Sequence, residues 1–92
     1  MRLDKFLKVS RLIKRRTVAK EVCDNGRVTI NGKVAKAASE VNPGDVLVIT
    51  FGQKVLTVKI LETRETVKAQ DAKNLYEILG KEHRVPELYR IL

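Results

Sequence analysis

The sequence predicts an α+β domain in which two N-terminal helices pack on a small antiparallel sheet. Three observations carry this prediction. Apolar residues recur at helical spacing over the first 25 positions, the period changes to two after Gly26, and turn-forming pairs then separate short apolar runs. The 92 residues suffice for one small core. We expect residues 1–50 to form one unit, and residues 51–92 to pack on it as an extension with a strand, a short helix and an apolar tail.

The first helix is predicted over residues 3–9. Leu3, Phe6 and Leu7 have i, i+3, i+4 spacing and share one face, which we expect to be buried. The opposite face is cationic, with Arg2, Lys5 and Lys8. Leu12 and Ile13 follow as an apolar anchor for the linker to the next helix.

The second helix is predicted from about Arg15 to Asn25. Its apolar stripe consists of Val18, Ala19, Val22 and Cys23. Glu21 stands one position too late to form a capping box with Thr17. Gly26 can adopt the left-handed conformation that ends a helix.

Short strands follow, separated by turns. Asn31-Gly32 predicts a type I′ hairpin turn, and Asp45 is expected to close the turn formed by residues 42–45. The predicted strands are Arg27–Ile30, Lys33–Lys36, Val46–Phe51 and Lys54–Leu61. A last helix is predicted over Ala72–Leu79 with Gly80 as its stop, and Val85-Pro86 then leads into an apolar tail.

The positive charge is confined to one part of the chain. Residues 1–36 contain 11 Lys or Arg and three Asp or Glu, a net charge of +8, whereas residues 37–92 contain eight of each sign. A surface charged only for solubility mixes its signs along the chain. The one-sided excess therefore predicts binding to a polyanion.

The densest cationic stretch, Lys14-Arg15-Arg16, stands at the start of the second predicted helix. A helix N-terminus carries partial positive charge, so these cations are unfavourable there until an anion binds. Asn31 is needed by its turn whether or not it meets a ligand. The candidate RNA-binding residues are Arg2, Lys5, Lys8, Arg11, Lys14, Arg15, Arg16, Lys20, Lys33 and Lys36.

Catalysis and metal binding find little support in the sequence. Cys23 falls on the core stripe of a helix, and His83 is expected to be a surface residue without a partner. We therefore predict no enzyme activity, catalytic residue, cofactor or metal. One cysteine, no signal-type N-terminus and no long apolar run indicate a cytoplasmic protein that does not span a membrane. The basic region lacks exposed aromatic rings, which favours structured RNA over a splayed single strand.

Four motifs in the first 50 residues support a resemblance: RLDKFL, RLIKRRTVA, GRVTINGKVAK and VNPGDVLVI. In order and spacing they resemble the S-four domain, the RNA-binding module named after ribosomal small-subunit protein four. The resemblance implies two helices over a small antiparallel sheet. It also implies a basic surface for structured RNA, built from the helix pair and the adjoining hairpin.

FGQK at residues 51–54 extends the resemblance to free-standing members of this family that act in bacterial ribosome-associated quality control. The resemblance implies binding to large-subunit rRNA and peptidyl-tRNA on stalled, split ribosomes. It also implies cooperation with an RqcH-type factor that adds C-terminal alanine to the nascent chain. We expect the protein to be a monomer.

Three alternatives stay open. The family also includes a small heat-shock protein that recycles free large subunits, but it has a longer basic tail, which this chain lacks. The domain also occurs appended to RNA-modifying enzymes, of which this chain would be a fragment. Finally, the first helix is basic and amphipathic, as in proteins that bind membrane surfaces, although it spans only about two turns.

Overall fold

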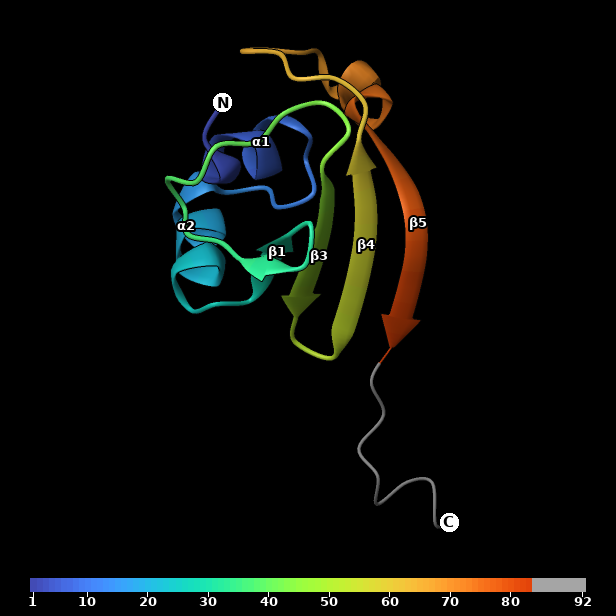
Figure 1. Ribbon diagram of the computed structural model, residues 1–92. Helices are drawn as coiled ribbons and strands as arrows, with labels where there is room; N and C mark the ends of the chain where they lie inside the picture. The colour runs from blue at the N-terminus through green and yellow to red at the C-terminus, as the bar shows by residue number, and fades with distance from the viewer. Residues whose placement is uncertain (84–92) are drawn as a thin grey trace, which may run out of the picture.

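The fold is taken from a computed structural model, which describes residues 1–83 (Figure 1). The predicted α+β class is confirmed: a helix pair packs on a five-stranded antiparallel sheet. The elements are α1 (Leu3–Val9), α2 (Arg16–Asp24), β1 (Val28–Ile30), β2 (Lys33–Val34), β3 (Val46–Phe51), β4 (Lys54–Ile60), the 3-10 helix η1 (Ala69–Leu75) and β5 (Tyr76–His83).

Both N-terminal helices form where the apolar spacing predicted them. Arg15 and Asn25, the predicted ends of the second helix, are the caps of α2. The start of the chain is held firmly, because the Leu3 amide donates to the Ser39 carbonyl (2.8 Å) and Arg2 forms a β-bridge with Glu40. Arg2 therefore has a fixed backbone despite its position near the N-terminus.

The sheet has the strand order β2-β1-β3-β4-β5, with every neighbouring pair antiparallel. Asn31 and Gly32 have φ of 50° and 88°, as the predicted type I′ turn requires. The Asn31 side chain accepts from the Val46 amide and donates to Asp45, and Asp45 accepts from the Asn42 amide. Both predicted turn roles, of Asn31 and of Asp45, are confirmed.

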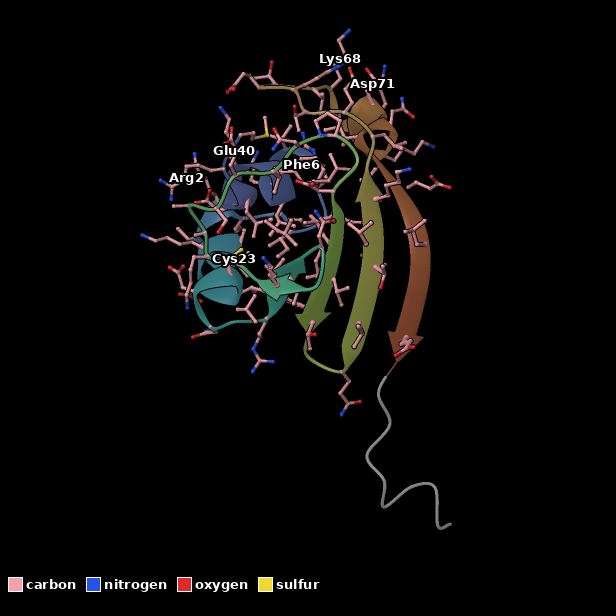
Figure 2. The ribbon with its side chains drawn as sticks, in the orientation of Figure 1. Arg2, Phe6, Cys23, Glu40, Lys68 and Asp71 are labelled. Atoms are coloured by element: carbon pink, nitrogen blue, oxygen red, sulfur yellow. The ribbon has the colours of Figure 1, made fainter. Side chains whose placement is uncertain are left out.

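The core lies between the helix pair and one face of the sheet. Phe6 and Cys23 from the helices are fully buried together with Leu47 and Val58 from the sheet. Figure 2 shows Phe6 between the helices and the strands. Burial, together with the negative charges of Asp4 and Asp24, raises the pKa of the Cys23 thiol to about 12. Cys23 is thus an inert packing residue, as its place on the apolar stripe indicated.

The predicted helix over Ala72–Leu79 is wrong. A 3-10 helix ends at Leu75, and the next eight residues form β5, which pairs with β4 along its whole length. A bulge in this pairing lies between Thr57 and Val58. The apolar spacing around residue 78 fits either a helix or a strand. Pairing with β4 favours the strand, because β4 would otherwise leave the backbone groups along one edge unpaired. Figure 1 shows β5 at the sheet edge farthest from the helices.

The predicted Val85-Pro86 break and the apolar tail lie outside the described residues, as does the side chain of His83. Within residues 1–83, no helix is long and apolar enough to cross a membrane.

Candidate nucleic-acid interface

A buried carboxylate in the basic region joins the two helices. Asp4 in α1 is 2% exposed, yet it carries charge because two guanidinium groups reach it. Arg2 donates from Nε to Oδ1 (3.1 Å) and from Nη2 to Oδ2 (3.3 Å). Arg16, from α2, approaches both oxygens at 3.5 Å. Arg2 and Arg16 therefore face the same side of the molecule, and we call them the arginine pair.

The electrostatics of Asp4 keep this arrangement ionised. Burial alone would raise the pKa of the Asp4 carboxyl. The hydrogen bonds from Arg2 and Arg16, the charge of Arg16 and the Lys5 amide (2.8 Å) outweigh burial and lower the pKa below its ordinary value. Asp4 is thus a carboxylate at neutral pH, and the three groups carry a net charge of +1.

The arginine pair is suited to binding phosphate. Each guanidinium has five N–H donors, and Asp4 occupies only some of them. The Arg2 and Arg16 side chains are about half exposed, at 50% and 49%, so their remaining donors face solvent. Figure 2 shows Arg2 on the outer side of the helix pair. Two forks held by one carboxylate are pre-organised to bind an anion.

The start of α2 extends this surface. Lys14 and Arg15 are exposed, and Arg15 is the N-cap residue without a side-chain cap. The first turn of α2 contains no acidic residue. Its free N–H groups and the helix dipole favour an anion beside the arginine pair.

The cationic side chains of α1 and of the residues just after it differ in their exposure and in whether they form an ion pair. Lys5 is only partly exposed and forms an ion pair with Glu65 from the loop after β4. Lys8 and Arg11 are exposed and line a small hollow of about 140 Å³ against residues 65–67. Arg11 has φ of 63°, a conformation that helix ends usually give to glycine.

The other predicted residues are exposed but are not all clustered. Lys20 lies one turn after Arg16 on α2. Lys36 donates from Nζ to the Asp24 carbonyl (3.3 Å), which places it at the C-terminal end of α2. Lys33 lies on β2, the edge strand beside β1. The structure thus joins Arg2 to Arg16, and it places Lys33 in a different element at the sheet edge.

Sequence reasoning missed two acidic residues that organise the surface, Asp4 and Glu65. A single acid inside a strongly basic segment was the available signal for Asp4, since such a residue is well placed to bridge cations. Glu65 had no comparable signal, because its contact with Lys5 spans 60 positions. In the described part of the chain, no group of three or more His, Cys, Asp or Glu is placed to hold a metal ion.

Comparisons with known proteins agree with this geometry. The family model of the S4 domain matches residues 1–47. The "RQC P-site tRNA stabilizing factor" of Halalkalibacterium halodurans is 63% identical over 82 residues, covering 89% of this chain and 93% of the relative. The protein of the same name from Bacillus subtilis is 62% identical and covers 89% and 95%. Among solved structures, the trimeric heat shock protein 15 of Vibrio cholerae has a TM-score of 0.80 at 30% identity, covering 87% of this chain and 82% of that one.

The match to the family model defines the broad class of this protein, the S4 domain proteins, whose helix pair packs on a small sheet. The matches to the individual relatives define a narrower family within that class. The chain belongs to the S4 domain family and, within it, to the family of the RQC P-site tRNA stabilizing factors. The resemblance predicted from the four sequence motifs is therefore confirmed.

Proposed function

We propose that this protein binds structured RNA on the large ribosomal subunit and takes part in ribosome-associated quality control, without catalysing a reaction. Its ligands in this proposal are large-subunit rRNA and the peptidyl-tRNA of a stalled, split ribosome. It would support C-terminal alanine tailing of the nascent chain with an RqcH-type factor, acting as a monomer in the cytoplasm. The name of the Bacillus subtilis relative refers to P-site tRNA, which supports the tRNA part of the proposal.

One observation carries the RNA-binding part, namely the arginine pair held by buried Asp4 beside an uncapped helix start. Two pre-organised guanidinium forks recognise a phosphate through fixed geometry, which a solvated charge cluster does not. The surrounding exposed cations add charge along the RNA backbone. We propose that residues 1–50 carry this activity and that residues 51–92 form an extension on the same small domain.

The test is a pair of matched variants assayed by co-sedimentation with purified large subunits. Arg16→Ala should weaken binding about tenfold, since a lost hydrogen bond between charged groups is worth on the order of 1.5 kcal/mol. Lys59→Ala is the control, because Lys59 is exposed on β4, between buried Val58 and Ile60, and so faces away from the helix pair. Circular dichroism would verify that both variants fold. Wild-type binding by a folded Arg16→Ala variant would refute the proposed interface.

The structural likeness to heat shock protein 15 favours one second candidate, the recycling of free large subunits. The two functions differ in the particle bound. A quality-control factor should bind large subunits carrying peptidyl-tRNA more tightly than empty ones, because the tRNA adds a second set of phosphates. Equal co-sedimentation with both particles would favour the recycling function.

A further inference from the structure

The described residues include a groove of about 730 Å³ that the proposed RNA surface leaves unexplained. It lies between the α1–α2 linker with the start of α2, on one side, and strands β3, β4 and β5, on the other. We call it the basic-rimmed groove. Its floor is apolar and includes Ile49, Phe51 and Leu56, and Val18 of α2 forms part of its wall. Its rim carries four cations: Lys14, Arg15, Lys54 and Lys81.

The groove exists because the apolar face of the sheet extends past the helix pair. Leu47 and Val58 are opposite one another in the β3–β4 ladder and are fully buried. Ile49 and Leu56 come next in the same ladder, on the same face, and Leu56 is only partly buried. Phe51 follows at the end of β3 and is 49% exposed. An uncovered aromatic ring at the end of a core face indicates a missing packing partner.

The chain itself supplies a segment at the right place. Lys81 and Glu82 of β5 line the groove, and His83 is the register partner of Lys54, which also lines it. The chain therefore leaves the described structure at the groove. Residues 84–92, RVPELYRIL, come directly afterwards. Their apolar members are Val85, Leu88, Tyr89, Ile91 and Leu92.

We propose that residues 84–92 of the same chain occupy the basic-rimmed groove and cover Phe51. Nine residues reach roughly 30 Å when extended, which is ample for a segment that starts at the groove's edge. Burying its apolar side chains against Phe51 and Leu56 removes both apolar surfaces from water. Glu87, the acidic side chain of the segment, would find cations around the rim.

Charge opposes a second copy of the protein more strongly than it opposes the chain's own segment, which the tether also favours. Each copy carries a net charge of +8, so two copies repel one another when the basic rims meet. Residues 84–92 contain two arginines and one glutamate and are tethered beside the groove, which gives them a high effective concentration. This proposal does not depend on RNA binding, and its test uses no RNA.

A nitroxide label on the full chain tests the proposal. Arg90→Cys provides the attachment point, because Cys23 is fully buried and does not react. We expect the methyl signals of Val18, in the groove wall, to broaden several times more than those of Val48. Val48 serves as the comparison because it neighbours Ile49 on β3 and points to the other face of the sheet. Equal broadening at Val18 and Val48 would overturn the proposal.

Two further measurements define the occupant. Phe51→Ser should abolish the preference for Val18, whereas Leu79→Ser, at a residue 51% exposed on β5 and outside the groove lining, should keep it. Amide spectra would verify that both variants keep the fold. Mixing isotope-labelled protein with an unlabelled, spin-labelled copy should give no broadening at Val18. Broadening only in that mixture would place a second copy in the groove and refute the intramolecular assignment.

Discussion

The cations of the basic surface are held in two different ways. Arg2 and Arg16 are fixed by hydrogen bonds to the buried carboxylate of Asp4. A second set of cationic side chains is exposed and forms no side-chain hydrogen bond or ion pair among the described residues. We call this second set the open cations. The open cations are Lys8, Arg11, Lys14, Arg15, Lys20 and Lys33. The difference separates two contributions to RNA binding. The arginine pair offers geometry, and the open cations offer charge.

The largest effect is expected from Asp4→Asn, which raises the net charge of the surface by one. If charge alone governed binding, affinity for large subunits would increase. We expect it to fall by more than tenfold, because Arg2 and Arg16 lose the acceptor that fixes them and then repel one another. Binding titrations with purified large subunits at fixed salt measure this change.

The same variant should lose about 1–2 kcal/mol of folding stability, which urea unfolding measures. The loss is modest for a buried carboxylate because both arginine side chains are half exposed and water screens their charges. The matched control is Asp71→Asn, since Asp71 is a partly exposed acid of η1. Tighter RNA binding by Asp4→Asn than by this control would contradict the geometric role of the pair.

Arg16→Lys sharpens the comparison further, because it keeps the charge and removes the fork. We expect a loss of about three- to fivefold in affinity, less than for Arg16→Ala, since a lysine ammonium donates as a point charge. Lys20→Arg is the converse change at an open cation and should alter affinity by less than a factor of about two. If Arg16→Lys and Lys20→Arg behave alike, fork geometry is unimportant at this surface.

The fold was predictable where local signals were strong. The Asn31-Gly32 turn, the stripe of α2 and the face of α1 each depend on residues close in sequence, and all three formed as predicted. The region after residue 70 was not, because its apolar spacing fits both a helix and a strand. The choice was made by pairing with β4, which is a long-range effect.

The candidate site was predictable to the same extent. Charge counting found the basic segment, and helical spacing put Lys5 and Lys8 on one face. It did not reveal that buried Asp4 brings Arg2 to Arg16, because that contact joins two helices. Nor did it reveal that Glu65 takes up Lys5. In a count of charges along the sequence, an acidic residue only lowers the net positive charge of the basic surface. In the structure, Asp4 and Glu65 also fix the positions of the cationic side chains that they contact.

Acid should weaken the fold through Asp4. Its pKa is lower in the folded state than the ordinary value of 3.8, so its ion pairs stabilise the fold fully above that value. Their contribution is lost as pH falls through the lowered folded pKa. The stability difference between wild type and Asp4→Asn should therefore be constant near neutral pH and shrink below about pH 3.8. Urea unfolding at several pH values measures it, and a difference that grows in acid would refute the assignment.

The open cations should determine the salt dependence. If the whole surface neutralises about five phosphates, the logarithm of the binding constant should fall against the logarithm of salt with a slope near −3.5 to −4.5. Removing Lys20 and Lys33 together should flatten the slope by roughly 1.4–1.8. Asp4→Asn should leave the slope nearly unchanged while lowering affinity. A slope near zero for the wild type would show that phosphates are not the ligand.

The smallest effect on RNA affinity is expected from Glu65→Gln, which breaks the ion pair between the neutral part of the chain, residues 37–92, and the basic part, residues 1–36. Glu65 lies in the loop after β4 and forms an ion pair with Lys5. If Lys5 is part of the proposed RNA surface, this ion pair competes with RNA for its charge. The Glu65 side chain is 76% exposed, and exposed ion pairs are weak, so stability should change by less than about 0.5 kcal/mol in Glu65→Gln. Freed Lys5 should raise affinity about twofold and steepen the salt slope by less than one unit. Glu77→Gln on β5 is the control, since it removes an exposed negative charge at the sheet edge far from the helices. Two outcomes would change this interpretation. Equal gains in both variants would mean that net charge alone is responsible.

A loss of affinity confined to Glu65→Gln would mean instead that the ion pair orients Lys5 toward RNA. Lys5 would then belong with the arginine pair rather than with the open cations.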